Sequence, residues 1–388
     1  MTTTRKLASI RRIKQLVEIP GAERIEIALV DGWQTVVQKG QFKEGELAVF
    51  CEIDSFIPTA LAPFLTGAGK PPSEYNGVQG ERLKTTKRMK QLSQGLLLSL
   101  ESCKPYLTAK LSEFEEGDNL SAALGIQKWE AAEEKVSNGS NQLASKTRSF
   151  PYFLRKTDQE RIQNYGHMVA QNLDTEFEVT VKKDGSSMTV FMVVPSSQYY
   201  KDAKEMIQGK PTLWNRLKQF VLRRPDQPVI GICSRNLLLN AEGSGNFHKA
   251  AEDVISEMLA GPVNRSYAVQ GEVVAPDIQG NYEKVKEVEF HIFDIFDIEN
   301  QNYLLPEDRQ YMLATDLMFL RSATVVDQGT LRNILQLKEG EDPVQKALVY
   351  ASGQGDNPGV MREGVVFKAK DKDFSFKAIS NEYLLHKG

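Results

Sequence analysis

The segment EVTVKKDGSS, which begins at Glu178, puts two lysines, an aspartate and a glycine at the end of a stretch that alternates like a β-strand. Side chains of a strand point alternately to its two faces. One face then carries Phe177, Val179 and Val181, and the other carries Glu178, Thr180, Lys182 and Asp184. Gly185 allows a sharp turn or a close backbone approach directly after them. Such a string suits either a functional strand end or a surface hairpin, and alone it is too short to distinguish the two.

Four downstream segments also set polar residues among apolar, strand-like runs. They are ICSRNLLL from Ile232, YAVQGEVVAPDIQG from Tyr267, FHIFDIFDIEN from Phe290 and REGVVFKAKDKDFSFKAISNEYLL from Arg362. Taken singly, each has a simple structural explanation. Glu272 could lie at a strand edge, Phe293 could belong to the core, and Glu363 could be the solvated start of a strand. Their order and content, however, favour a site assembled from several strands.

The elements that must position these residues fall into two regions. Residues 7–100 contain short alternating segments separated by Gly and Pro, which predicts a small all-β unit, a barrel or a sandwich. Residues 128–149 are rich in Ala, Ser, Asn and charge and have little to bury, so they are interpreted as a linker. The rest contains strands and helices, among them a helix predicted for FHKAAEDVISEMLA from Phe247. We therefore expect domains at 1–130 and 150–388, joined by a linker at 131–149.

Two segments concentrate positive charge. The first contains Arg82, Lys84, Lys87, Arg88 and Lys90, and the second, a basic and helical insertion, contains Lys210, Arg216, Lys218, Arg223 and Arg224. Each is consistent with a solvated surface or with a surface that follows a phosphate backbone. The chain as a whole carries 48 basic and 51 acidic residues, for a net charge of −3, so a uniformly basic nucleic-acid coat is excluded.

The totals describe an ordinary globular protein. With 388 residues, 41% hydrophobic and 26% charged, the chain is expected to form two domains. Cys51, Cys103 and Cys233 lie far apart and form no CxxC pair, which argues against a disulfide framework or a zinc knuckle. The charged N-terminus does not resemble a signal peptide, and no run of 18 apolar residues occurs. We expect a soluble, intracellular protein.

The ordered segments resemble the motifs of the covalent nucleotidyltransferase superfamily, most closely ATP-dependent RNA ligases. Lys182-Lys183-Asp184-Gly185 resembles motif I, and Ser234-Arg235-Asn236 the arginine-bearing segment after it. Gln270-Gly271-Glu272 is similar to motif III, and FHIFDIFDI to motif IIIa. Glu363-Gly364 resembles motif IV, and Lys377 lies in a segment similar to motif V. Residues 1–130 are similar to the OB module that precedes the catalytic domain in one RNA ligase branch.

This resemblance implies an α+β fold: an OB-like β-barrel followed by an ATP-grasp-like ligase domain with antiparallel sheets. It also implies roles for individual residues. The catalytic residues would be Lys182, Asp184, Glu272, Glu363 and Lys377, with Lys182 as the nucleophile and Lys183 as the next candidate. The nucleotide would contact Thr180, Lys182, Gly185, Arg161, Arg235, Glu272, Lys377 and the ring of Phe293. Asp184, Glu272 and Glu363 would surround Mg²⁺ or Mn²⁺, in part through water.

Two positions depart from the family pattern. Many members carry a K-x-K pair at motif V, whereas this chain has Ser375-Phe376-Lys377, so Lys368 or Lys370 is expected to compensate. Some relatives have an acidic residue before the nucleophile, where this chain has Val181. Adenine selectivity would then come from Thr180, backbone groups or elsewhere.

The implied reaction transfers AMP from ATP to Lys182, then to an RNA 5′-phosphate, before an RNA 3′-hydroxyl displaces AMP. A lysine with a pKa near 10.4 is rarely neutral at pH 7, so we expect Lys377 or a divalent metal to lower the pKa of Lys182. The expected partner is RNA with 3′-hydroxyl and 5′-phosphate ends, with a nicked duplex favoured and RNA repair as the setting. Neither a membrane nor a protein partner is expected.

Two other functions are retained. A DNA ligase or capping enzyme would normally carry an OB domain after motif V, and the eleven residues that follow Lys377 leave no room for one. A non-catalytic RNA-binding module would be expected to have lost its site residues, whereas the motif lysines and carboxylates are intact.

Overall fold

The computed structural model describes residues 5–108, 110, 113–130, 148–208, 226–240 and 243–387. The chain divides into two compact units, Met1–Ser140 with Asn381–Gly388, and Asn141–Ser380. Most of the predicted linker lies outside the described residues, as does the basic segment that contains Lys210, Arg216, Lys218, Arg223 and Arg224. The two units are described separately below.

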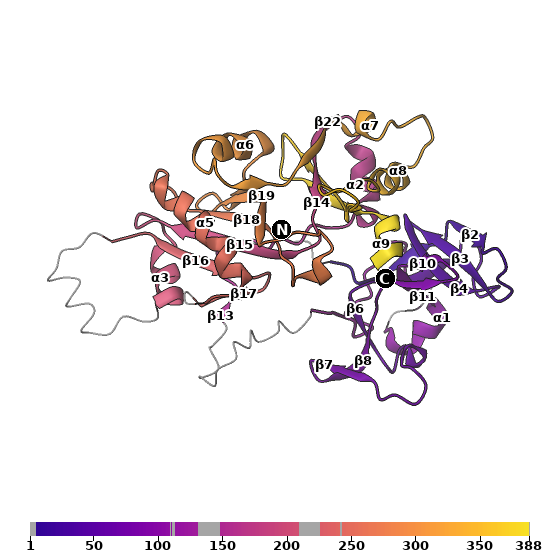
Figure 1. The fold of residues 1–388 in the computed structure, drawn as a ribbon. Helices are drawn as coiled ribbons and strands as arrows, with labels where there is room; N and C mark the ends of the chain where they lie inside the picture. Colours follow the sequence, from indigo (N-terminus) through magenta and orange to yellow (C-terminus); the bar gives the residue numbers. More distant parts are fainter. Residues whose placement is uncertain are drawn as a thin grey trace. The chain divides into compact units, whose positions relative to one another are not determined.

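The first unit is built from short antiparallel strands (Figure 1). One sheet orders β1 (Ala8–Arg12), β5 (Leu47–Glu52) and β11 (Gly95–Ser99), and another orders β2 (Gln15–Glu18), β3 (Ile25–Val30) and β4 (Trp33–Gln38). A third orders β12 (Gln127–Lys128), β6 (Ser55–Pro58), β8 (Val78–Arg82) and β7 (Ser73–Tyr75), and β9 (Thr86–Arg88) pairs with β10 (Gln91–Ser93). The prediction of an all-β N-terminal unit is confirmed.

The described strands of this unit fall into four hydrogen-bonded groups. Beside β4, side-chain hydroxyls supply part of the bonding between these groups. The Val36 N–H donates to Ser93 Oγ at 3.0 Å, and Thr35 Oγ1 donates to the Gly95 carbonyl at 2.9 Å. Hydroxyl groups can bond locally to backbone groups in this way and so interrupt a regular ladder.

Two α-helices that the model describes belong to the same unit. Helix α1 (Leu100–Cys103) is capped by Ser99, whose hydroxyl accepts the Ser102 N–H. Helix α9 (Asn381–Lys387) is the last element of the chain. Gln94 Nε2 donates to Asn381 Oδ1 at 3.3 Å, and Lys87 Nζ donates to the Leu385 carbonyl. A cation at the C-terminal end of a helix is favourable because it meets the helix dipole and an unpaired carbonyl.

The second unit contains a large sheet and a smaller one, both mainly antiparallel, as predicted for the ligase domain. The large sheet orders β13 (Arg148–Ser149), β17 (Leu237–Leu238), β16 (Val229–Cys233), β15 (Ser186–Val193), β18 (Tyr267–Val274), β19 (Glu289–Asp297) and β20 (Asn302–Tyr303), and β21 (Arg321–Ser322) pairs with β19. Helix α5 (Asn246–Ala260) packs against β15, β16 and β18 and confirms the predicted helix (Figure 1). Helices α3 (Tyr200–Gln208) and α6 (Pro306–Thr315) complete this part.

The smaller sheet carries the predicted nucleophile. It orders β22 (Val325–Thr330), β14 (Glu176–Lys182), β23 (Gly364–Ala369) and β24 (Ser375–Ile379). Its core contains Phe177, Val179, Phe367 and Phe376, and helices α2 (Gly166–Gln171), α7 (Leu331–Ile334) and α8 (Pro343–Tyr350) add apolar residues to the same cluster. The rings of Phe367 and Phe376 stack with centroids 4.9 Å apart. The apolar face predicted from the alternation of β14 is therefore the core face.

The polar face of the smaller sheet is linked to the second unit's other elements by buried ion pairs. Arg309 of α6 donates a hydrogen bond to Glu178 of β14, and Lys368 Nζ of β23 lies 2.5 Å from Asp294 Oδ1 of β19. All four side chains are buried. Buried charges are tolerated when they are paired. These pairs hold the polar face of β14 and β23 against the large sheet, where the predicted site residues lie.

The cysteines and the helices agree with the composition. Cys51, Cys103 and Cys233 are buried and unbridged. Of the helices that the model describes, none combines the length and the apolar character that a membrane crossing needs.

Candidate active site

Lys182 and Glu363 meet because β14 and β23 are antiparallel neighbours. Lys182 is the last residue of β14 and pairs with Gly364, the first residue of β23. Glu363 immediately precedes that strand, and its Oε2 lies 2.6 Å from Lys182 Nζ. The side chains are 25% and 15% exposed, so each is partly accessible.

Glu272 approaches from the large sheet, and Gly185 permits this approach. A Cβ on Gly185 would lie 2.3 Å from the Val273 carbonyl oxygen and 2.9 Å from Glu272 Cγ. Glycine is therefore required here by the close contact of the loop after Lys182 with β18. This is the second of the two roles that the sequence left open for Gly185.

The three predicted metal-binding carboxylates set the charge around the nucleophile. Burial lowers the pKa of Lys182, but the nearby charges of Glu363, Glu272 and Asp184 raise it, and the net shift is upward. This result corrects the expectation of a lowered pKa in the free protein, because the carboxylates outweigh the effect of burial. Burial, together with Glu363 and Asp184, also raises the pKa of Glu272 to about 7, even though Lys182 acts in the opposite direction.

Arg161 and Lys377 form a cationic side of the site. They pair as an isolated bridge, and the Lys377 N–H donates to the Glu160 carbonyl at 2.8 Å. Burial, followed by the charges of Arg161 and Lys182, lowers the pKa of Lys377 to about 7. Arg235 is more exposed and lies 2.5 Å from Asp158, although its charge still acts on Glu272.

Phe293 occupies an irregular position in β19. Gln270 pairs with Asp294 and Gly271 pairs with Ile292, so Phe293 is the extra residue of a β-bulge. Bulges redirect side chains and are common beside active sites. Phe293 is half-buried, and Lys368 Nζ lies 5.7 Å from its ring centroid and donates to its carbonyl.

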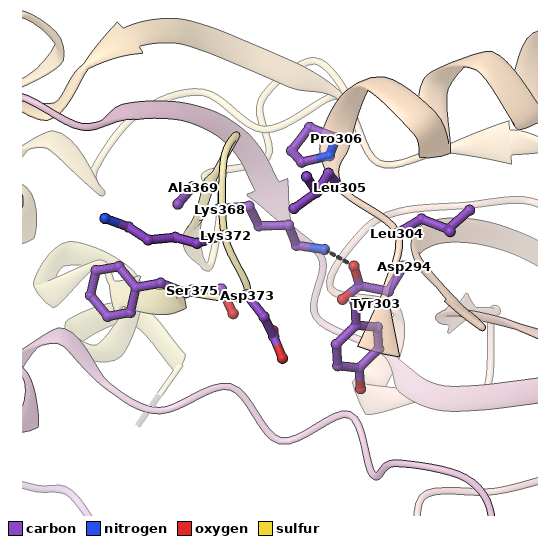
Figure 2. A pocket seen from close by; sticks show the side chains of 11 residues that line it. Asp294, Tyr303, Leu304, Leu305, Pro306, Lys368, Ala369, Lys372, Asp373 and Ser375 are labelled. Atoms are coloured by element: carbon purple, nitrogen blue, oxygen red, sulfur yellow. Dashed lines mark ion pairs between the residues drawn. The ribbon is translucent and has the colours of Figure 1, made fainter. Parts of the chain in front are cut away.

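An open pocket is lined in part by Asp294, the residue after Phe293, and by Tyr303, Lys368, Lys372 and Ser375 (Figure 2). Figure 2 shows the amine of Lys368 reaching Asp294 at the centre of this view. The pocket combines apolar walls with a buried ion pair.

The strand register distinguishes between the two lysines proposed to replace the missing motif V lysine. Lys368 pairs directly with Ser375, the position that corresponds to the first lysine of the expected K-x-K pair. Burial lowers the pKa of Lys368 to about 8, while Asp294 opposes this shift. Lys370 instead donates to Gln328 of β22 at 2.7 Å. Directly opposed residues share a sheet face, so Lys368 is the better placed of the two.

Thr180 lies on β14, two residues before Lys182 and therefore on the same face of that strand. It is buried between β22 and β23, where it pairs with Val325 and Val366. Val181 is fixed by its N–H, which donates to the Thr324 carbonyl at 2.9 Å.

Several carboxylate partners in the site were not predicted. Lys183 Nζ lies 3.3 Å from Glu283 Oε2 and 2.7 Å from Asp356 Oδ2, so this second lysine has carboxylate partners different from those of Lys182. Glu178 and Asp294 are buried and paired. A carboxylate inside an apolar strand was a usable signal for Asp294, whereas nothing local distinguishes Glu283 from a solvated glutamate.

Among the residues that the model covers, no group of three or more His, Cys, Asp or Glu side chains is arranged to hold a metal ion directly. Glu363, Glu272 and Asp184 nevertheless all raise the pKa of Lys182, and Glu363 lies 2.6 Å from its amine.

Comparisons with known proteins agree with this geometry. Residues 7–100 match an OB-fold domain family, and residues 175–379 match the RNA ligase family. Among solved structures, the chain is similar to Naegleria gruberi RNA ligase at 36% identity. The match to a glutamate-to-alanine variant of that enzyme with ATP and Mn covers 99% of both chains and has a TM-score of 0.72. The match to the enzyme with PPi covers 98% of both chains and has the same TM-score of 0.72. Among curated proteins, none matches.

The family match spans more than half of the chain, and the structural similarity extends over nearly all of it. It includes both the N-terminal OB-fold region and the strands that carry Lys182, Glu272, Glu363 and Lys377. This chain therefore belongs to the RNA ligase family.

Proposed function

We propose that the protein is an ATP-dependent RNA ligase that joins an RNA 3′-hydroxyl to a 5′-phosphate through a lysyl-AMP intermediate on Lys182. The observation that carries the proposal is the setting of the Lys182 amine. The Lys182 side chain is partly exposed, and its amine lies 2.6 Å from Glu363. The negative charges of Glu272 and Asp184 also raise its pKa. A partly accessible lysine with carboxylates and a cationic group nearby is suited to attack phosphorus and to take up AMP covalently.

The spacing of functional residues supports the assignment. Solved variants of the Naegleria enzyme replace an arginine, a lysine and an aspartate whose separations equal those of Arg161, Lys182 and Asp184. They also replace a glutamate and a lysine separated as Glu363 and Lys377 are. These variants were solved with ATP or AMP and Mn, or without ligand. Equal spacing of identical residue types favours equivalent roles in this chain.

In the first step, the neutral Lys182 amine attacks the α-phosphorus of ATP. A phosphorus–nitrogen bond forms, the bond from the α-phosphorus to the bridging oxygen breaks, pyrophosphate leaves with that oxygen, and the nitrogen releases one proton to solvent. Arg161 and Lys377 hold the phosphate oxygens, the first as a planar fork and the second as a point charge. Lys377 is suited to this role because the negative phosphates would raise its lowered pKa and restore its charge.

The residues fit a divalent cation. Oxygen donors from carboxylates are the ligands that Mg²⁺ and Mn²⁺ prefer, and Asp184, Glu272 and Glu363 supply them near Lys182. Contact in part through water agrees with the lack of a direct cage among the described residues. When bound, the ion supplies positive charge that offsets the carboxylates and the triphosphate. Without it, the carboxylates keep Lys182 protonated and unreactive.

The adenosine end would lie toward Phe293 and the pocket that Asp294 lines. The ring of Phe293 offers a stacking surface, and the bulge in β19 gives it a position outside the regular ladder. Thr180 and the backbone near Gly185 would line the path to the phosphates. Val181 is apolar, so the base must be selected by other groups.

In the later steps AMP passes to the RNA 5′-phosphate, and the RNA 3′-hydroxyl then displaces it. The OB-fold unit is the proposed RNA-binding part. In its basic segment, Lys84, Arg88 and Lys90 are exposed, whereas Arg82 packs over Trp129 at 3.7 Å and Lys87 contacts α9. Three of the five cations therefore remain available for phosphates, and binding should weaken as salt increases. Sealing of RNA breaks makes RNA repair the expected setting.

A sealing assay tests this function. A nicked RNA duplex with a labelled 5′-phosphate is incubated with the protein, ATP and Mn²⁺, and parallel reactions contain a single strand, a nicked DNA duplex or GTP. We expect joined RNA product with ATP and the RNA nick. Joining of DNA alone, or activity with GTP alone, would instead favour a DNA ligase or a capping-type enzyme. RNA binding without any product would favour a non-catalytic module.

A further inference from the structure

Lys183 and Asp184, the two residues after the proposed nucleophile, share one carboxylate partner. Glu283 Oε2 lies 3.3 Å from Lys183 Nζ, and Glu283 Oε1 accepts the Asp184 N–H at 3.0 Å. The Glu283 side chain is 4% exposed. One buried glutamate therefore binds both the Lys183 side chain and the Asp184 backbone amide.

Glu283 is itself held by its surroundings. Asn357 Nδ2 donates to the Glu283 carbonyl at 2.7 Å, and the neighbouring Asp356 provides the second carboxylate for Lys183 at 2.7 Å. Within the same loop, the Asn281 side chain closes a ring of two hydrogen bonds with the backbone of Val285, at 3.0 and 2.9 Å. Glu283 and its contacts are thus held by two segments, residues 281–285 and 356–357, that lie far apart in the sequence.

The loop also contacts the glycine that follows. Gln279 Nε2 donates to the Gly185 carbonyl at 3.4 Å. Residues 279–283 therefore bind three consecutive positions, Lys183, Asp184 and Gly185, directly after Lys182. None of these contacts reaches Lys182 Nζ or the predicted phosphate-binding side chains.

We propose that Glu283 is a positioning residue for the Lys182 nucleophile. This inference rests on the proposed function. By fixing the Lys183 side chain and the Asp184 amide, Glu283 fixes the strand end from which Lys182 and Asp184 project. In-line attack requires the amine to lie close to phosphorus and on the axis of the leaving group, and small misplacements are costly to the rate. Lys183 accordingly acts as an anchor and not as a second nucleophile.

The test measures the rate constant for transfer of AMP from α-labelled ATP to the full-length protein under single-turnover conditions, over a range of ATP concentrations. Glu283→Gln keeps the shape of the side chain but removes the charge that holds Lys183. We expect a rate constant lowered roughly tenfold, and lowered further in Glu283→Ala, while the ATP concentration for half-maximal rate changes less than about threefold. Arg161 and Lys377 are unaltered, which is why ATP binding should be spared.

Glu287→Ala is the matched control, because Glu287 is exposed and lies four positions further along the same segment. It should label like the wild type. Thermal unfolding of each variant shows whether it is folded, and Glu283→Gln decides the matter if Glu283→Ala does not fold. A wild-type rate constant in Glu283→Gln, or a loss that appears only in ATP affinity, would overturn the proposal. Absence of label in the wild-type protein would instead overturn the proposed function.

Discussion

At the scale of single residues, the site is a balance between three carboxylates and a group of cations. The carboxylates raise the pKa of Lys182, whereas burial and two cations lower the pKa of Lys377 to about 7. Two lysines of the same site thus differ in charge near neutral pH because their neighbours differ. The free protein holds its nucleophile protonated, and its phosphate-binding lysine gains a charge only when an anion arrives.

This difference predicts proton uptake when ATP binds. At pH 8 a lysine with a pKa of about 7 is mostly neutral, and negative phosphates raise that pKa, so binding should take up close to one proton. Calorimetry of a non-transferring ATP analogue without metal, in buffers of different ionisation enthalpy, measures this uptake. Lys377→Met should reduce it by most of one proton. Lys370→Met, at a lysine bound to Gln328, is the control, and equal uptake in all three proteins would refute the assignment.

Residue types alone predicted part of this site. The alternation of β14 identified Lys182 and Thr180 as neighbours on the polar face, because a strand has a fixed period. The partners of Lys183 could not be predicted: Glu283 and Asp356 reach it through loops about a hundred or more positions away. Their signal exists only in the folded chain, where burial makes an unpaired charge costly.

At the scale of elements, the site depends on how closely the loop after β14 approaches β18. The sequence indicated a glycine at the turn but did not show which strand it would meet. The structure shows that the Val273 carbonyl occupies the space that any side chain on Gly185 would need. The contact brings Glu272 near Lys182. The lack of a side chain at Gly185 is therefore needed both for the packing of the loop and for the position of this carboxylate.

Gly185→Ala should therefore damage both stability and activity. The added Cβ would lie 2.3 Å from a backbone oxygen, and overpacking of this kind costs about 1–3 kcal/mol. Urea unfolding measures the loss, and labelling with ATP measures the displaced Lys182.

Gly245→Ala provides the comparison, because a Cβ at Gly245 meets nothing within 4 Å and its backbone angle is ordinary. Its free energy of unfolding should change by well under 1 kcal/mol. Equal destabilisation of the two variants would show that the close approach to β18 is not what restricts Gly185.

At the scale of the whole molecule, the sequence predicted an OB-fold unit and an antiparallel ligase unit, and the family comparisons agree. The predicted functional boundaries stay predictions. Compactness groups Asn381–Gly388 with the first unit, although these residues follow motif V in sequence. Helix α9 is too short to reveal its packing partner, and the contacts with Lys87 and Gln94 arise only on folding.

The grouping affects how the units should be separated. Removing residues 1–130 alone would strip α9 of its hydrogen bonds with Lys87 and Gln94. Removing residues 1–130 and 381–388 together should spare labelling with ATP and abolish RNA sealing, since the proposed nucleotide site lies within Asn141–Ser380. The protein that lacks only residues 1–130 should bind more of an apolar dye than the double deletion, because it keeps α9 without its partners. Parallel loss of labelling and sealing in the double deletion would contradict a substrate-binding role for the first unit.

The most direct measurement of the central claim is to locate the covalent AMP. The protein is incubated with α-labelled ATP and Mn²⁺, digested, and the modified peptide is sequenced by mass spectrometry, with Lys182→Ala and Lys370→Ala in parallel. The account predicts one AMP on Lys182, no label in Lys182→Ala, and full label in Lys370→Ala. Label that persists in Lys182→Ala, or that maps to Lys183, would contradict it.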